Sequence, residues 1–183
     1  EAVDSIIVLE PAKILADIKV IPSCFGENEG VIEINNGRLQ YVTSGCIKMK
    51  DQDLPARLKT IFESVSEVID SAGAEFLAIE DVFVSRNARS AIVLGQARGA
   101  AISAGVNRGL PVGEYTALQI KKSVVGYGQA DKTQVQHMVR SILALDGVPQ
   151  QDAADALACA ICHSHTLEHR LGMGIKKQLK AKS

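Results

Sequence analysis

The chain contains 183 residues, of which 46% are hydrophobic and 22% charged, and this composition predicts one folded domain with a sizeable core. The formal net charge of −1 excludes a uniformly cationic nucleic-acid binder, so any such surface must be a local patch. No apolar run reaches the roughly 20 residues that a membrane span needs, and no secretory signal pattern is present. The four cysteines are too few for a disulfide scaffold, so we expect a protein of the cytoplasm with no membrane partner.

The predicted elements alternate between helix and strand after an initial hairpin. We expect strands at residues 4–9, 30–35, 38–45, 75–80 and 110–115, and helices at 58–69, 88–106, 131–145 and from 152 onward. Asn36 and Gly37 between two alternating apolar runs predict a hairpin turn, and Gly73 ends the first helix. Residues 10–30 give no clear pattern. This order of elements predicts an α/β fold with a mixed central sheet.

The predicted helix over 88–106 carries three glycines, Gly95, Gly99 and Gly105. Each glycine inside a helix costs about 1 kcal/mol relative to alanine. We therefore expect another part of the structure to pack very closely against this helix. The strands before and after it are expected to be parallel neighbours.

Two aspartates at a spacing of i and i+3, Asp152 and Asp155, open the Ala-rich last helix. Side chains at this spacing are neighbours on one helix face, so their like charges repel. One interpretation is that they cap the free N–H groups of the first turn and complement the helix dipole. The other is that they bind a divalent metal. Glu80, at the end of an apolar strand, favours the metal, because strand-end and helix-start carboxylates can converge on Mg²⁺.

Several segments of the chain together resemble the RuvC family of Holliday junction resolvases. They follow the family's order: Ser44–Lys48, Ala78–Phe83 (Ala-Ile-Glu-Asp-Val-Phe), Asn87–Ala91, Leu94–Gly99 (Leu-Gly-Gln-Ala-Arg-Gly), Glu114–Ala117, Gln119–Gly126, Asp131–Met138 and Asp152–Ala158. The resemblance covers residues 31 to about 166. It implies a ribonuclease-H-like fold, with a mixed central β-sheet flanked by α-helices. The implied function is resolution of four-way DNA junctions in homologous recombination and repair, by Mg²⁺-dependent paired nicking.

The resemblance also assigns roles to individual residues and partners. It implies that Glu80, Asp152 and Asp155 are the catalytic metal ligands, with two Mg²⁺ ions per subunit that Mn²⁺ can replace. It places Lys121 and Lys132 near the scissile phosphate and Phe83 against DNA bases. The helix over 88–106 matches the family's dimer helix, so a homodimer is expected. The family's branch-migration helicase complex is the implied protein partner.

The N-terminal segment departs from the family, whose first strand ends in Gly-x-Asp-Pro-Gly and supplies the first metal ligand. The best ungapped match puts Glu10 in the place of that Asp, and Asp17 is a second candidate. A third alternative is that the segment supplies no functional ligand. Residues 1–29 are either a divergent N-terminus or not native family sequence, for example through a shifted reading frame.

We expect a single nuclease domain over residues 1–168, including the divergent 1–29, followed by a basic, solvated tail over 169–183. The alternative to a resolvase is a dimer that binds junctions but cleaves poorly or not at all, because the first catalytic Asp is absent. A nuclease of the same fold that acts on other branched or RNA-containing DNA is a further rival. The pattern Cys159-x-x-Cys162-His163 fits haem attachment and, with His165, zinc, but we interpret these cysteines as helix core.

Overall fold

A computed structural model describes residues 4–9, 29–35, 38–45, 53–81 and 88–180 of the chain. Within them, the elements in chain order are β1 (Asp4–Leu9), β2 (Glu29–Asn35), β3 (Arg38–Gly45), α1 (Leu54–Ala72), β4 (Phe76–Glu80), α2 (Ala88–Asn107), β5 (Val112–Tyr115), α3 (Ala117–Val125), α4 (Lys132–Ile142) and α5 (Gln151–Lys180). Every strand and helix predicted from the sequence is present. The short helix α3 was not predicted.

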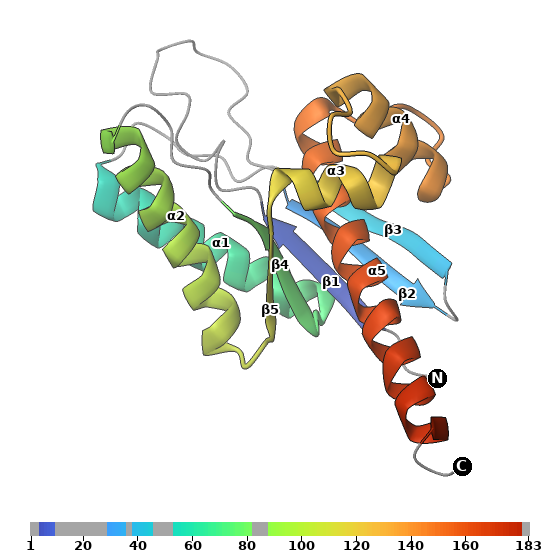
Figure 1. The fold of residues 1–183 in the computed structure, drawn as a ribbon. Coiled ribbons are helices and arrows are strands. Elements are labelled where there is room, and N and C mark those ends of the chain that lie inside the picture. Colours follow the sequence, from blue (N-terminus) through green and yellow to red (C-terminus); the bar gives the residue numbers. More distant parts are fainter. Residues whose placement is uncertain (1–3, 10–28, 36–37, 46–52, 82–87, 181–183) are drawn as a thin grey trace.

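One five-stranded sheet, in the order β3-β2-β1-β4-β5, forms the centre of the molecule (Figure 1). β1 pairs antiparallel with β2, and β2 pairs antiparallel with β3, which confirms the predicted hairpin. β1 pairs parallel with β4, and β4 pairs parallel with β5. The sheet is therefore mixed, as predicted, and the carboxyl ends of β1, β4 and β5 lie at one edge.

The strands separate two hydrophobic cores, because successive side chains along a strand point to opposite faces of the sheet. Leu77 and Ile79 of β4 pack with residues of α1 and α2 on the side that we call the α2 face. Ala78, between them, packs with residues of α3, α4 and α5 on the opposite side, the α5 face. Figure 1 shows α1 and α2 together on one side of the sheet and α5 across the other.

The helix ends follow from local sequence. Asp53 accepts a hydrogen bond of 3.0 Å from Ala56 N at the start of α1, and Gly73 ends that helix with a φ of 61°. α3 begins with a capping box in which Thr116 and Gln119 bond reciprocally, and it ends at Gly126 with a φ of 95°. The missed helix therefore had both a start signal and a stop signal in the sequence.

The three glycines of α2 have different surroundings. A Cβ built on Gly105 would lie 2.5 Å from Leu77 Cδ2, so this glycine allows α2 to pack closely on β4, as predicted. A Cβ on Gly95 or Gly99 would meet nothing within 4 Å among the described residues. Close packing within the chain therefore explains Gly105 and leaves Gly95 and Gly99 on an open surface.

α5 is the longest helix of the described chain, and Ala154 and residues 156 to 164 of it are buried. The helix continues through Lys180, so most of the predicted tail is an extension of α5. Among the described residues, no helix is long and apolar enough to cross a membrane.

Candidate active site

Glu80 is the last residue of β4, at the edge of the sheet where the parallel strands end. The partner of Ile79 on β1 is Leu9, which is the last residue of that strand. β1 and β4 therefore end side by side. In open α/β sheets, binding sites form at the carboxyl ends of strands, so this edge is the place to look for a site.

The first turn of α5 lies at the same edge. Leu157 packs onto Gly30, where a Cβ would lie 2.9 Å from its Cδ2, and Gly30 is in the same row of the sheet as Ala78. Further along α5, His163 contacts Phe76 at the beginning of β4, with ring centroids 5.5 Å apart. α5 therefore runs from the carboxyl ends of β1 and β4 toward the amino end of β4 (Figure 1).

This direction places Asp152 and Asp155 near the end of the sheet at which Glu80 stands. Both aspartates are partly buried, and the Asp155 side chain is 19% exposed. Lys132 at the start of α4 lies with its Nζ 3.8 Å from Asp155 Oδ2. The structure thus brings together two of the predicted residues, one carboxylate and one lysine, across α4 and α5.

Lys121 lies on α3, which packs against both α4 and α5. Its neighbour Ile120 is buried in the core of the α5 face, and Lys121 itself is half-buried. The capping box at Thr116 fixes the start of this short helix directly after β5. The local sequence therefore holds Lys121 on a defined helix rather than on a loop.

Three residues named from the sequence lie outside the described part of the chain: Glu10, Asp17 and Phe83. Among the residues that the structure describes, no three carboxylate, imidazole or thiol groups gather closely enough to hold a metal ion. The available donors are nevertheless carboxylate oxygens on a strand end and a helix start, which are the ligands that Mg²⁺ prefers. Mg²⁺ keeps several waters and needs few protein ligands, so the chemistry of the donor set fits this ion.

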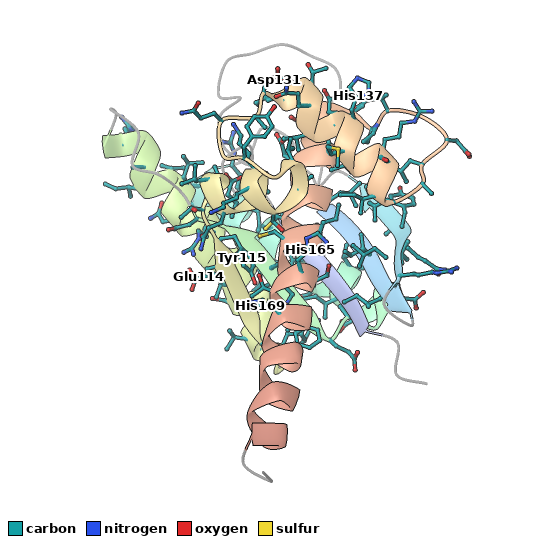
Figure 2. All side chains as sticks on the ribbon, turned by 45° about the vertical axis from the view of Figure 1, so that its right-hand side comes forward. Glu114, Tyr115, Asp131, His137, His165 and His169 are labelled. Carbon is teal, nitrogen blue, oxygen red and sulfur yellow. The ribbon has the colours of Figure 1, made fainter. Side chains whose placement is uncertain are left out.

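Cysteines and histidines of α5 are buried or hydrogen-bonded to neighbouring elements. Cys159 and Cys162 are buried, and burial raises the pKa of the Cys162 thiol. His163 Nδ1 lies 2.7 Å from the Tyr115 hydroxyl, and His165 Nδ1 lies 3.0 Å from Ser123 Oγ. Figure 2 shows Tyr115 and His165 where β5 and α3 meet α5. These contacts agree with the interpretation of the segment as core.

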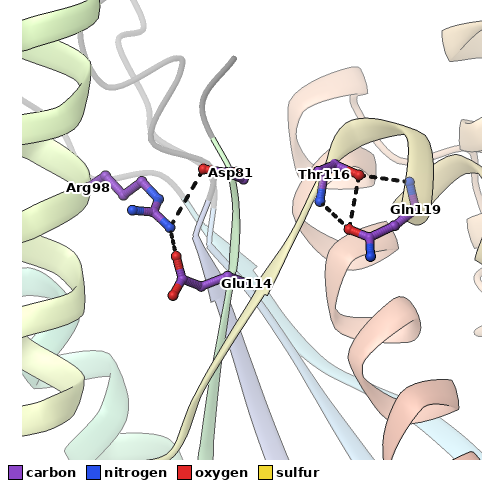
Figure 3. A network of polar contacts seen from close by, with 5 residues as sticks. All are labelled: Asp81, Arg98, Glu114, Thr116 and Gln119. Atoms are coloured by element: carbon purple, nitrogen blue, oxygen red, sulfur yellow. Dashed lines mark hydrogen bonds and ion pairs between the residues drawn. The ribbon is translucent and has the colours of Figure 1, made fainter. Parts of the chain in front are cut away.

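A polar network that the sequence analysis did not predict lies on the α2 face, behind Glu80. Arg98 of α2 binds Glu114 of β5 and reaches Asp81, the residue after Glu80 (Figure 3). Arg98 and Glu114 are 16 positions apart in the chain. The pairing of β4 with β5 brings the two carboxylates together, and no sequence pattern signals it.

Known proteins share this sequence and this fold. The family model described as "Crossover junction endodeoxyribonuclease RuvC" matches residues 24–163. The protein of that name from Azoarcus sp. (strain BH72) is 59% identical over 136 residues, which are 74% of each chain. The one from Saccharophagus degradans is 51% identical over 162 residues, 88% of this chain and 94% of the relative. The solved structure of T. thermophilus RuvC in complex with Holliday junction substrate has a TM-score of 0.77 and 27% identity, and the match covers 92% of this chain and 96% of that one.

The fold and the relatives together define a nuclease of the ribonuclease-H-like class. The fold expected from the sequence is therefore confirmed. The matched segment excludes the first 23 residues, in keeping with the divergence noted above. The chain belongs to the RuvC family of crossover junction endodeoxyribonucleases.

Proposed function

We propose that this chain is a structure-specific endonuclease that resolves four-way DNA junctions in homologous recombination and DNA repair. The observation that carries the proposal is the placement of Asp152, Asp155 and Lys132 at the edge of the sheet where β4 ends in Glu80. Carboxylates suit a hard cation, and a lysine beside them suits the phosphate that the cation would bind.

In this proposal Glu80, Asp152 and Asp155 hold Mg²⁺, two ions per subunit, and Mn²⁺ can replace it. The bound ions supply Lewis acidity and neutralise the charge that develops on the phosphate oxygens. Glu10 is the proposed fourth ligand, because the strand that precedes it ends beside β4. The aspartate pair gains from this arrangement, since a divalent cation removes the repulsion between two carboxylates on one helix face.

The lysines act on the DNA rather than on the metal. Lys132 is 55% exposed, so its ammonium group can leave Asp155 and contact a phosphate oxygen when DNA arrives. Lys121, on the neighbouring helix α3, is proposed to contact an adjacent phosphate. Phe83 is proposed to pack against bases near the crossover. Such binding depends mainly on phosphate contacts, so it weakens as salt concentration rises.

A homodimer is part of the proposal because α2 exposes a row of small and apolar residues that a second copy could cover. One row of its exposed residues recurs at helical spacing and is small or apolar: Ile92, Gly95, Gly99, Ser103 and Val106. Ile92 and Val106 at the two ends of this row are 62% and 58% exposed. Glycines in such a row let two helices approach closely. A second copy of this chain would cover the surface and provide two sites for two symmetric strands.

The test is nicking of a synthetic four-way junction by the full chain, with Mg²⁺ and with EDTA. We expect paired, symmetric nicks that need the metal, and no cleavage of a linear duplex or of an RNA–DNA hybrid. Cleavage of the hybrid instead would assign the chain to a different nuclease activity of this fold. Two further parts complete the proposal: the family's branch-migration helicase complex, which rests on the resemblance alone, and a cytoplasmic location, which rests on the small number of cysteines.

The alternative, a dimer that binds junctions without cutting them because the first catalytic Asp is absent, is not favoured, since the relatives are named crossover junction endodeoxyribonucleases. Tight junction binding with no nick at any Mg²⁺ concentration would establish it. Glu10→Asp combined with Val8→Gly and Ala12→Gly would then test whether this segment is the cause.

A further inference from the structure

Arg98 of α2 joins the ends of two strands on the α2 face. Its Nη2 donates a hydrogen bond to Glu114 Oε2 of β5 and lies 3.8 Å from Asp81 Oδ1, directly after β4. The Arg98 side chain is 19% exposed, whereas those of Asp81 and Glu114 are 57% and 56% exposed. The guanidinium is thus the inner member of the network, held between two carboxylates that would otherwise repel each other (Figure 3).

Glu80 and Asp81 leave β4 toward opposite faces of the sheet. Ile79 belongs to the core of the α2 face, so by alternation Asp81 faces α2 and Glu80 faces α5. The backbone of Asp81 is still part of the ladder, because Asp81 N donates a hydrogen bond of 2.7 Å to Tyr115 O. A contact that fixes Asp81 on the α2 face therefore also orients the preceding residue, Glu80, on the α5 face.

We infer that Arg98 is a positioning residue for Glu80. By holding Asp81 and Glu114 together on the α2 face, it fixes the ends of β4 and β5 and with them the direction in which Glu80 projects on the α5 face. The inference rests on the proposed function, in which Glu80 binds the metal. Both contacts are made by one nitrogen, Nη2, of a guanidinium that stays charged at all working pH values, which suits it to hold two carboxylates.

The chain offers a matched control at the other end of α2. Arg108 donates from Nε and Nη2 to the two carboxylate oxygens of Asp70 on α1, each at 2.6 Å. This pair also joins α2 to a neighbouring element and is also partly exposed. It follows the last turn of α2, whereas Arg98 lies opposite the strand end that carries Glu80. Loss of Arg108 therefore measures the effect of removing an α2 ion pair without touching the strand ends.

The experiment measures metal affinity in the absence of DNA, by electron paramagnetic resonance during a Mn²⁺ titration of the full chain. The variants are Arg98→Met, Arg98→Lys and Glu114→Gln, with Arg108→Met as the control and Glu80→Gln as the reference for a lost ligand. Thermal unfolding and junction binding in EDTA are measured for each. We expect Arg98→Met to weaken Mn²⁺ binding roughly tenfold, the range typical of groups that orient metal ligands. Arg98→Lys should fall between it and the unchanged chain.

The control decides between positioning and general stability. Arg108→Met should lower the unfolding temperature but leave Mn²⁺ affinity within about twofold, below the range seen for orienting groups. If Arg98→Met does not fold, Glu114→Gln and Arg98→Lys carry the test. Unchanged Mn²⁺ affinity in the Arg98 and Glu114 variants, with a clear loss in Glu80→Gln, would overturn the inference and spare the proposed function. An unchanged chain that binds no Mn²⁺, or a Glu80→Gln variant that binds it normally, would overturn both.

Discussion

The two faces of the sheet differ in the chemistry that they expose. The α5 face carries carboxylates and lysines on helix starts and strand ends, with Lys132 beside Asp155. The α2 face carries apolar core, the Arg98 network, and a helix whose outer surface includes a row of small and apolar residues. Because successive side chains along a strand point to opposite faces, neighbouring residues such as Glu80 and Asp81 can have different roles. We infer that one face binds and cuts DNA while the other assembles the dimer and braces the strands.

The largest effect that separates the faces is expected from Glu80→Gln. This change keeps the shape of the side chain but removes the charge that a divalent cation needs. We expect nicking of a four-way junction to fall by about 100-fold or more, with junction binding in EDTA retained. The matched control is Glu63→Gln on α1, an exposed glutamate of the α2 side that pairs with Lys59 at 3.6 Å. Equal losses in the two variants would contradict the division between faces.

A smaller loss is expected from Lys132→Met, which removes a phosphate contact and the partner of Asp155. We expect nicking to fall by about tenfold or more, because a misplaced or uncompensated phosphate slows the reaction. The salt dependence of junction binding should also lose about one unit of slope, as for the loss of a single phosphate contact. Lys59→Met, on α1, should change neither quantity. If the salt dependence of junction binding is unchanged in the Lys132 variant, Lys132 does not contact a DNA phosphate.

The same substitution at two glycines of α2 should have opposite consequences. Gly99→Glu places its side chain in open space in the monomer, so we expect normal stability but a weakened dimer, because the charge meets its own copy. Gly105→Glu drives a charge into Leu77, and we expect a loss of several kcal/mol of unfolding free energy. Sedimentation and thermal unfolding distinguish these outcomes. A Gly99→Glu variant that stays fully dimeric would show that this helix surface is not the interface.

The smallest effect is expected at Asp70, which has no part in either task. Hydrogen bonds from Arg108 lower the pKa of Asp70 below its usual value in the folded chain. The pair therefore stabilises the fold at pH values above the usual aspartate range, and this contribution disappears as the pH falls through the lowered pKa. Asp70→Asn should lower the unfolding temperature slightly at neutral pH, and the difference should close in strong acid. The side chain is 61% exposed, so salt should reduce the effect.

Local patterns predicted most of the fold. The hairpin of β2 and β3 follows from a turn dipeptide between alternating runs, and α1 follows from its apolar spacing and Gly73. α3 was missed because it has nine residues, of which only Ile120 and Val124 are buried, too few to show a period. Its capping box, Thr116 to Gln119, was the readable signal. The sheet topology also agrees with the predicted mixed order, since the parallel pair β4–β5 is joined by α2.

The candidate site was only partly predictable. Strand-end and helix-start positions drew attention to Glu80, Asp152 and Asp155, and the family resemblance supplied the rest. The Arg98 network was out of reach, because it depends on the register between β4 and β5. The first ligand stays a prediction, with Glu10 preferred over Asp17 from the ungapped match, since both lie outside the described residues.

The end of β5 carries three successive anchors to three different helices. Glu114 binds Arg98 of α2, Tyr115 shares a hydrogen bond with His163 of α5, and Thr116 caps α3. Each anchor depends on which way its side chain points, and a strand reverses that direction at every residue. One residue inserted between Val112 and Glu114 would therefore turn both strand anchors, Glu114 and Tyr115, to the wrong faces at once. Within these few residues the strand therefore tolerates no shift by one position.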